Sequence, residues 1–272
     1  MFNDDYKIIQ RMTPLLQRVL VIDPQAASAR LVSELMRSIA RSQVWTATSA
    51  DKAMGVCRMA DPQIIFVELS GPGVDGAAFT QMLRRSDLAC RQAPVVMMTA
   101  VATAAGIMAA RDAGVHEFLR KPFTTKDLLR RLEAVTLRPR DWIEAVGYVG
   151  PDRRRFNSGD YSGPLKRRSD PRETPDSARM VQALKILSSA VAAIDSDPAQ
   201  ALRSMQAQAV ELQRTAVALS NMALSSATAD FQRYLTASIE AGPLVAADVA
   251  VNAAPLLEFL PKESLKTHEV AA

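Results

Sequence analysis

Four side chains that carry reactive groups follow four separate apolar runs in the first half of the chain. Short apolar runs rich in β-branched residues are typical of buried strands. The carboxyl ends of parallel strands form the crevice in which α/β proteins carry out their chemistry. We therefore expect two carboxylates, a hydroxyl and an ammonium group to share one site, in which the Glu68 carboxylate can reach Lys121 and the Thr99 hydroxyl. The set comprises Asp23, Glu68, Thr99 and Lys121.

The elements that must position this site alternate between strand and helix. Strands that are apolar on both faces, separated by amphipathic helices, predict a parallel sheet covered on both sides. The predicted fold class is α/β, a five-stranded doubly wound parallel sheet. We expect strands at 18–22, 44–47, 63–67, 94–98 and 115–119, and helices at 25–40, from the N-cap Ser49 to Met59, around Phe79, Met82 and Leu83, up to Gly114, and at 126–137.

Four motifs follow one another along this half of the chain. They are Val19-Leu20-Val21-Ile22-Asp23, the loop ending in Val74-Asp75-Gly76, the run from Pro94 to Ala100, and the run from Ala113 to Phe123. In these motifs and their order, the chain from Gln17 to Arg138 resembles the receiver domain of bacterial two-component response regulators. The resemblance implies a flavodoxin-like fold and a part in phosphorelay, chemotaxis or cell-cycle signalling.

The chain departs from the family pattern at two positions that do chemistry. The family's Mg²⁺-binding acidic pair is reduced to Asp23 followed by Pro24, and its phosphorylated Asp is replaced by Glu68. Mg²⁺ demands near-octahedral oxygen coordination, and Pro24 removes one carboxylate ligand. Glu68 carries its carboxylate one methylene further out, which disturbs in-line phosphoryl transfer. We expect weakened or lost Mg²⁺ binding, no catalytic residue and a protein that is not an enzyme.

Other positions match the family. Thr99 corresponds to its switch residue, Lys121 to its invariant Lys and Phe118 to its aromatic switch position, with a cis bond expected before Pro122. Glu68 leaves three interpretations open. It can form a retained ion pair with Lys121, or mimic part of the −1.5 to −2 charge of a phosphoryl group with its own −1, or belong to a conventionally phosphorylated receiver.

The segment 139–175 has a different composition, with Pro, Gly, Ser and clustered basic residues, and predicts a flexible linker. It contains a short repeat, Tyr-x-Gly-Pro-x-(Arg/Lys)-Arg-Arg, whose copies begin at Tyr148 and Tyr161. Three roles are open: a basic tether, a segment that docks on an acidic partner or RNA, and a site for an anionic nucleotide such as cyclic di-GMP, because the triple Arg is similar to the arginine motif of PilZ-type receptors. The candidate anion-binding residues are Arg153, Arg154, Arg155, Lys166, Arg167 and Arg168.

The region 176–260 predicts helices only, with Asp197 as an N-cap and Pro198 in the first turn. Its apolar stripes favour a hairpin or small bundle, which dimerisation could complete. The only His in this half, His268, lies in the tail 261–272, so we do not expect a phosphotransfer bundle. The Arg residues of these helices are spread out, so we expect no DNA binding.

Composition limits the remaining possibilities. The 272 residues carry a net charge of +4 and two cysteines, which excludes a disulfide framework. The sequence lacks a signal-like N-terminus and a membrane-spanning run. We expect a cytoplasmic protein with an N-terminal extension at 1–16, a receiver-like domain at 17–138, and a signalling partner such as a histidine kinase.

Overall fold

The computed structural model describes residues 2–153 and 174–261. Within these ranges the chain divides into two units, one containing 2–143 and 148–153 and the other containing 144–147 and 174–261. Each unit is described by itself. The predictions for 154–173, which cover most of the expected linker, and for the end of the tail lie outside the described residues.

The first unit is built on a five-stranded parallel sheet with the strand order β2-β1-β3-β6-β7. This order confirms the predicted fold class. The strands agree with the predicted runs to within two residues at each end. They are β1 (Arg18–Ile22), β2 (Gln43–Ala47), β3 (Ile64–Glu68), β6 (Val95–Thr99) and β7 (Glu117–Arg120).

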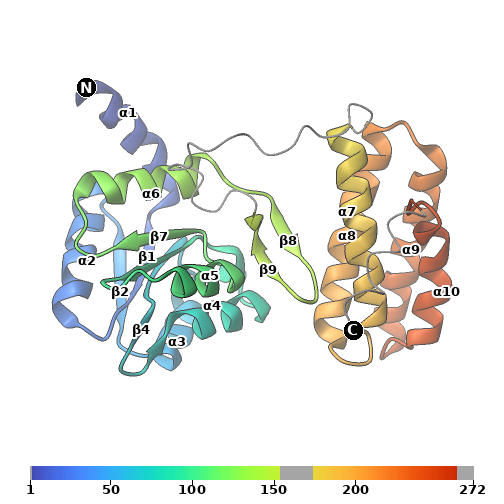
Figure 1. Ribbon diagram of the computed structural model, residues 1–272, viewed down its shortest axis with the longest axis horizontal. Coiled ribbons are helices and arrows are strands. Elements are labelled where there is room, and N and C mark those ends of the chain that lie inside the picture. Colours follow the sequence, from blue (N-terminus) through green and yellow to red (C-terminus); the bar gives the residue numbers. More distant parts are fainter. Residues whose placement is uncertain (1, 154–173, 262–272) are drawn as a thin grey trace. The chain divides into compact units, whose positions relative to one another are not determined.

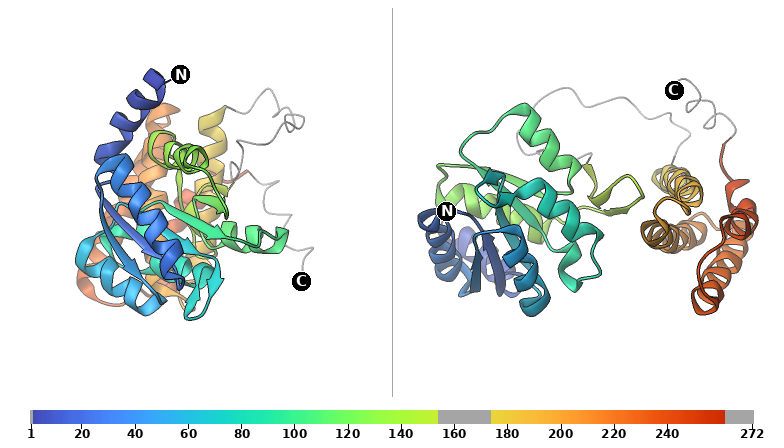
Figure 2. Two further views of the ribbon diagram at one scale, coloured as in Figure 1. Left: turned by 90° about the vertical axis from the view of Figure 1, so that its left-hand side faces the viewer. Right: turned by 90° about the horizontal axis from the view of Figure 1, so that it is seen from below.

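Helices cover both faces of this sheet (Figure 1, Figure 2). One face packs against α2 (Ala26–Ala40) and α6 (Thr125–Leu137). The other packs against α3 (Ala50–Ala60), α4 (Gly76–Arg85) and α5 (Ala104–Asp112), with the short β4 (Ser70–Gly71), β5 (Val74–Asp75) and η2 (Ala89–Gln92) nearby in the chain.

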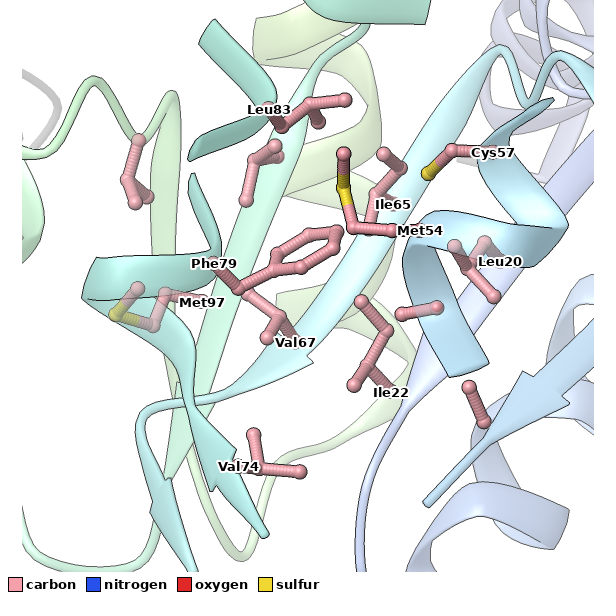
Figure 3. Close-up of a cluster of buried hydrophobic side chains, with 14 of the residues drawn as sticks. Leu20, Ile22, Met54, Cys57, Ile65, Val67, Val74, Phe79, Leu83 and Met97 are labelled. Carbon is pink, nitrogen blue, oxygen red and sulfur yellow. The ribbon is translucent and has the colours of Figure 1, made fainter. Parts of the chain in front are cut away.

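Alternation along the central strands sends their side chains to two separate cores. In β1, Val19 and Val21 enter the core beneath α2 and α6, whereas Leu20 and Ile22 enter the core beneath α3 and α4, as the period of two in a strand requires. Figure 3 shows the ring of Phe79 in the middle of the second core. Burial on both faces explains why these strands are apolar throughout.

Helices α3 and α6 of the first unit begin with hydrogen-bonded N-caps, and the first of these, Ser49, confirms the prediction from the sequence. Ser49 caps α3 by accepting a hydrogen bond from the Lys52 amide, and Thr124 caps α6 in a reciprocal pair with Asp127. Of the three residues around which α4 was predicted, Phe79 and Leu83 are buried, whereas Met82 is 44% exposed.

The N-terminal segment belongs to the first unit's core, whereas the sequence set 1–16 apart as an extension. It forms α1 (Phe2–Met12) and the 3-10 turn η1 (Thr13–Leu15). Met12 and Leu16 are fully buried in the core beneath α2 and α6. The segment therefore covers apolar surface that the sheet and its helices leave open.

The expected flexible linker at 139–175 needs a correction at its start. Residues 142–144 and 149–151 form β8 (Trp142–Glu144) and β9 (Val149–Pro151), which pair as a two-stranded sheet. Tyr148 and Val149 are buried. The Tyr148 hydroxyl donates to the Pro151 carbonyl at 2.6 Å, and burial raises the pKa of Tyr148 to about 12. Burial of these side chains orders a segment whose composition indicated a tether.

The side chain of Arg84 is fully buried and donates hydrogen bonds to the backbone carbonyls of three other residues of the first unit. The Arg84 guanidinium donates to the carbonyl of Gly114 at 3.0 and 3.1 Å, and to those of Arg91 and Ala93 at 2.5 and 3.0 Å. It also lies 5.3 Å from the ring centre of Trp142. Burial lowers the pKa of Arg84 to about 9. Backbone carbonyls solvate this charge in place of water.

His116 completes the same cluster. Its Nδ1 lies 3.2 Å from Arg84 Nη2 and 3.3 Å from the Val95 amide. Since both neighbours are donors, Nδ1 acts as the acceptor and the proton sits on Nε2. Burial, with the nearby charges of Arg84 and Arg140, lowers the pKa of His116 well below its usual value. The imidazole is therefore neutral in the folded protein.

The second unit is a bundle in which each of four helices contacts two others. Their apolar stripes meet in one core, with Leu187, Leu212 and Phe231 almost fully buried. The predicted N-cap Asp197 and Pro198 at the start of the second helix are confirmed. Because the stripes are buried within one chain, they do not need dimerisation to be covered. The helices are α7 (Pro175–Ala192), α8 (Pro198–Ala218), α9 (Met222–Ala241) and α10 (Ala246–Leu257).

Residues 144–147 belong to the second unit and are bonded to polar side chains of α8. Gln200 Nε2 donates to the Glu144 carboxylate at 2.8 Å. Ser204 and Gln208 donate to the Glu144 backbone carbonyl at 3.0 and 3.1 Å. These hydrogen bonds explain the burial of Gln200, Ser204 and Gln208 on α8. In the described part of the chain, we find no helix that is both long and apolar enough to cross a membrane.

Removing the buried arginine should destabilise the first unit. We expect Arg84→Ala to lower its free energy of unfolding by about 3 kcal/mol, because three carbonyls lose their donor and a cavity opens. Urea unfolding followed by tryptophan fluorescence measures this selectively, since Trp45 and Trp142, the chain's two tryptophans, both belong to the first unit. The exposed neighbour Arg85→Ala is the control and should change stability by less than about 0.5 kcal/mol. Equal effects of the two substitutions would contradict the structural role of Arg84.

The neutral histidine predicts a pH dependence. Its folded pKa lies below the unfolded value, so the unfolded state takes up a proton that the folded state refuses as pH falls below about 6.5. Above that pH, His116 therefore does not change the free energy of unfolding. Below it, His116 lowers the free energy of unfolding by up to ~1.4 kcal/mol per pH unit. In His116→Asn, the amide oxygen can accept in place of Nδ1 but does not titrate. Between pH 6.5 and 5 the wild type should lose more stability than this variant; parallel curves would argue against the assignment.

Candidate functional site

The four site residues lie at the carboxyl edge of the sheet, as the sequence predicted. Glu68 and Thr99 are the last residues of β3 and β6, and Asp23 and Lys121 directly follow β1 and β7. The peptide bond between Lys121 and Pro122 is cis, as expected. The strand order brings the ends of β1, β3 and β6 side by side.

Lys121 binds both carboxylates of the site at once. Its Nζ lies 2.6 Å from Asp23 Oδ2 and 2.5 Å from Glu68 Oε2. The side chains of Asp23, Glu68 and Lys121 are only 1%, 11% and 17% exposed. One ammonium group thus neutralises one of two buried negative charges and donates a hydrogen bond to each carboxylate. The extra methylene of Glu68 is compatible with this close contact.

The surroundings of Asp23 are fully occupied. Its second oxygen, Oδ1, accepts a hydrogen bond from the Gln25 amide at 2.8 Å. The neighbouring Pro24 ring packs against Gly71, where an added Cβ would lie 2.6 Å from Pro24 Cγ. Gly76 lies equally close to the Glu68 backbone, since a Cβ there would meet the Glu68 carbonyl oxygen at 2.4 Å. Both glycines allow the loop after β3 to fold tightly over the site.

Thr99 and Phe118 are placed differently from the charged residues. The Thr99 hydroxyl accepts from the Val101 amide at 3.2 Å and lies 3.4 Å from the Val101 carbonyl. Its bonds are therefore made with its own loop, whereas the sequence had suggested a contact with Glu68. Phe118 is 6% exposed and packs in the core beneath α3 and α4.

The carboxylate oxygens of the site already accept hydrogen bonds from other groups of the chain. Both Asp23 oxygens are engaged, and one Glu68 oxygen is held by Lys121. Within 2–153 and 174–261 no group of three or more His, Cys, Asp or Glu side chains could hold an ion. A hard cation such as Mg²⁺ requires several oxygen ligands that are free to coordinate it. In this structure the site is an ion-pair cluster of Asp23, Glu68 and Lys121.

The candidate anion-binding residues are described only in part. Arg153 forms an ion pair with Asp112 at 3.0 Å and lies 4.3 Å from the ring centre of Tyr148. These partners were not anticipated, although the repeat that contains Tyr148 and Arg153 was visible in the sequence. The other five candidates lie outside the described residues: Arg154, Arg155, Lys166, Arg167 and Arg168.

Residues 19–133 match the model of the response regulator receiver domain. This part of the chain belongs to that family, as its motifs predicted. Among solved structures, the chain is similar to the chemotaxis protein CheY4 of Vibrio cholerae, with 24% identity, a TM-score of 0.41, and coverage of 43% of this chain and 96% of that one. It is also similar to the receiver domain of the sensor histidine kinase PA1611 of Pseudomonas aeruginosa, with 22% identity, a TM-score of 0.40, and coverage of 43% and 94%.

The similar curated proteins are regulators of transcription by name. The chain is 31% identical over 121 residues to the DNA-binding dual master transcriptional regulator RpaA of Synechocystis, covering 44% of this chain and 49% of that protein. It is 28% identical over 122 residues to the probable transcriptional regulator ycf27 of Porphyridium aerugineum, covering 45% and 49%. The chain spans about half the length of these relatives. Their names give no support to our expectation that this chain does not bind DNA.

Removing the cation of the ion-pair cluster should destabilise the first unit. We expect Lys121→Met to lower the free energy of unfolding of the first unit by about 3 kcal/mol, because two buried carboxylates lose their common counter-charge. The exposed Lys126 on α6 provides a matched control, and Lys126→Met should change stability by less than about 0.5 kcal/mol. Tryptophan-monitored urea unfolding compares the two. A Lys121→Met protein as stable as the wild type would show that the cluster holds little energy.

Proposed function

We propose that this chain is a receiver-type signalling adaptor that works without phosphorylation, by binding another protein. The observation that carries the proposal is the position of Lys121 Nζ, within 2.6 Å of both Asp23 and Glu68. The family match supports a role in two-component signalling. The charges of the pocket support independence from phosphoryl transfer.

The charges in the pocket oppose a phosphoryl group. Two carboxylates and one ammonium leave a net charge of about −1 at a largely buried site. A phosphoryl group on Glu68 would carry −1.5 to −2 charges in place of the −1 of the carboxylate, where the single cation is already shared with Asp23. Like charges held close together in a poorly solvated site repel strongly. Glu68 instead places its own carboxylate permanently against Lys121.

The partner surface we favour is the face built by α5, β7 and α6. Val101, which directly follows β6, and Met108 on α5 are 70% and 50% exposed. Lys126 and Arg130 on α6 are exposed as well. A patch with an apolar centre and a charged rim suits a protein partner. We propose a signalling protein, such as a histidine kinase, as that partner.

The helical bundle would supply a second docking or self-association surface. Val210 and Val217 lie two helical turns apart on α8 and are 66% and 69% exposed, so they share one side of the helix. The bundle's own core is covered without them. These residues are therefore available to a partner, which can be another protein or a second copy of the chain.

We do not advance the cyclic di-GMP hypothesis as a second function. Arg153, the one candidate residue within the described ranges, already pairs with Asp112 and stacks on Tyr148. A nucleotide would have to displace that pair.

The proposal predicts that the protein resists chemical phosphorylation. The full chain incubated with acetyl phosphate and Mg²⁺ should show no phosphoryl adduct by intact mass, because Glu68 is held by Lys121 and the metal ligands are incomplete. The double variant Pro24→Asp/Glu68→Asp restores both missing carboxylate positions and should gain an adduct under the same conditions. A conventional receiver serves as the reaction control.

Partner capture provides the second readout. Pull-down with the wild-type chain should recover the same signalling partner with and without acetyl phosphate. An adduct on the wild type that disappears in Glu68→Gln or Asp23→Asn would show a working phosphoacceptor, and the adaptor proposal would then be wrong.

A further inference from the structure

The first copy of the repeat sits in a defined seat on the first unit. We use the term seat for Asp112 and Gly114, which lie at the end of α5 and just beyond it. Tyr148, Gly150 and Arg153 of the first copy contact it. Each contact depends on a particular residue type.

The backbones of Gly114 and Gly150 lie in close contact. A Cβ on Gly150 would lie 2.7 Å from the Gly114 Cα, and a Cβ on Gly114 would lie 2.5 Å from the Val149 carbonyl oxygen. Any side chain at either position would collide with the opposite backbone. Gly114 and Gly150 also have φ values of +89° and +157°, and the first lies in the region that favours glycine. The repeat's glycine is therefore a requirement of the seat.

The aromatic and basic positions of the repeat are used as well. Tyr148 is 7% exposed and fills the space beside Gly150. Arg153 stacks on that ring and pairs with Asp112. Burial raises the pKa of Asp112, but hydrogen bonds from Arg153 and Arg111 outweigh it, so that the pKa lies below its usual value. The seat thus selects an aromatic ring, a glycine two residues later and a cation three residues after that.

The second copy has all three features at the same spacing. Tyr161, Gly163 and Lys166 correspond to Tyr148, Gly150 and Arg153, and each lies 13 positions later (161 − 148 = 13). Pro164 likewise corresponds to Pro151, whose carbonyl accepts from the tyrosine. Lysine supplies the positive charge that Asp112 needs. The Asp112–Arg153 pair is 45% exposed on both sides, where either cation serves.

We propose that segment 161–168 of this chain competes with the first copy for the seat. The chain then contains two segments that fit one site, and the segment that is displaced from the seat becomes a free basic arm. Thirteen residues can span roughly 3.3–3.6 Å each, so the second copy can reach the seat of its own chain or that of a second copy of the chain. This inference stands on the repeat and the seat, and does not rest on the adaptor function.

The native residues allow a direct test. A water-soluble carbodiimide joins a carboxylate to an amine with no spacer, so it can link Asp112 to Lys166 but not to Arg153. In the full-length wild type, where the first copy fills the seat, this link should be rare. Gly150→Val removes the first copy's fit and should raise the yield of the Asp112–Lys166 peptide pair by roughly tenfold, as expected when a competing occupant is lost.

Matched variants control the experiment. Gly150→Val/Gly163→Val spoils both copies and should return the Asp112–Lys166 yield to the wild-type level. Arg153→Lys places an amine at the seated position and should give a link between Asp112 and position 153, which verifies the chemistry. Links from Lys166 to the exposed Asp51 report random collisions and should stay constant across all variants. Tryptophan fluorescence confirms that the first unit remains folded in each.

Each result of the cross-linking experiment either supports or overturns the proposal. A rise in Gly150→Val that Gly163→Val abolishes supports the proposal, and migration of the linked species as monomer or dimer tells whether the second copy occupies its own seat or that of another chain. A Gly150→Val protein with a folded first unit and no rise overturns it. A rise that survives Gly163→Val also overturns it, since the link would then not depend on the fit of the repeat.

Discussion

The arrangement of the site depends on a single ammonium group placed between two buried carboxylates. Asp23, Glu68 and Lys121 come from the ends of three different strands, and none of the three side chains is more than 17% exposed. A buried carboxylate without a partner is strongly unfavourable. The three chain segments therefore hold one another in place, and the positions of β1, β3 and β7 at this edge are coupled through one charge.

Elsewhere in the first unit, a buried cation is stabilised by backbone carbonyls instead of carboxylates. Arg84 is fully buried, and the described carbonyls of Gly114, Arg91 and Ala93 surround it with partial negative charges. Carbonyl dipoles are fixed by the backbone, so this cation orders the loops that present them. The same cluster carries Trp142 and neutral His116, which makes β8 and β9 part of the folded unit. A buried cation thus organises the chain at two separate places.

The sequence predicted those features that depend on local pattern, and missed those that depend on distant contacts. The five strands were recognisable because burial on both faces makes them apolar throughout, and Asp197 with Pro198 marked a helix start by residue type alone. The helix α1 packs Ile8, Ile9 and Met12 against the core beneath α2 and α6, a contact with distant residues that its own sequence does not identify. The strand β9 depends on Gly150 meeting Gly114, a contact that no local pattern reveals. In the site, membership was predictable, but the turn of Thr99 towards Val101 was not, because rotamers follow from the completed loop.

These constraints bear on how such a protein can transmit a signal. A switch needs two packings that differ by a few kcal/mol, and an input that binds one of them better. In the receiver site the Lys121 bridge favours one arrangement from within the chain, since Glu68 is present in every molecule. An external signal must then supply its differential binding energy elsewhere, and moving such an equilibrium from 1:99 to 99:1 requires about 5.5 kcal/mol. Contact with a protein surface can provide that energy, and the proposed adaptor function assigns the input to such a contact. Under the proposed adaptor function, the input of this protein therefore acts at its surfaces, away from the crevice at the carboxyl ends of the strands.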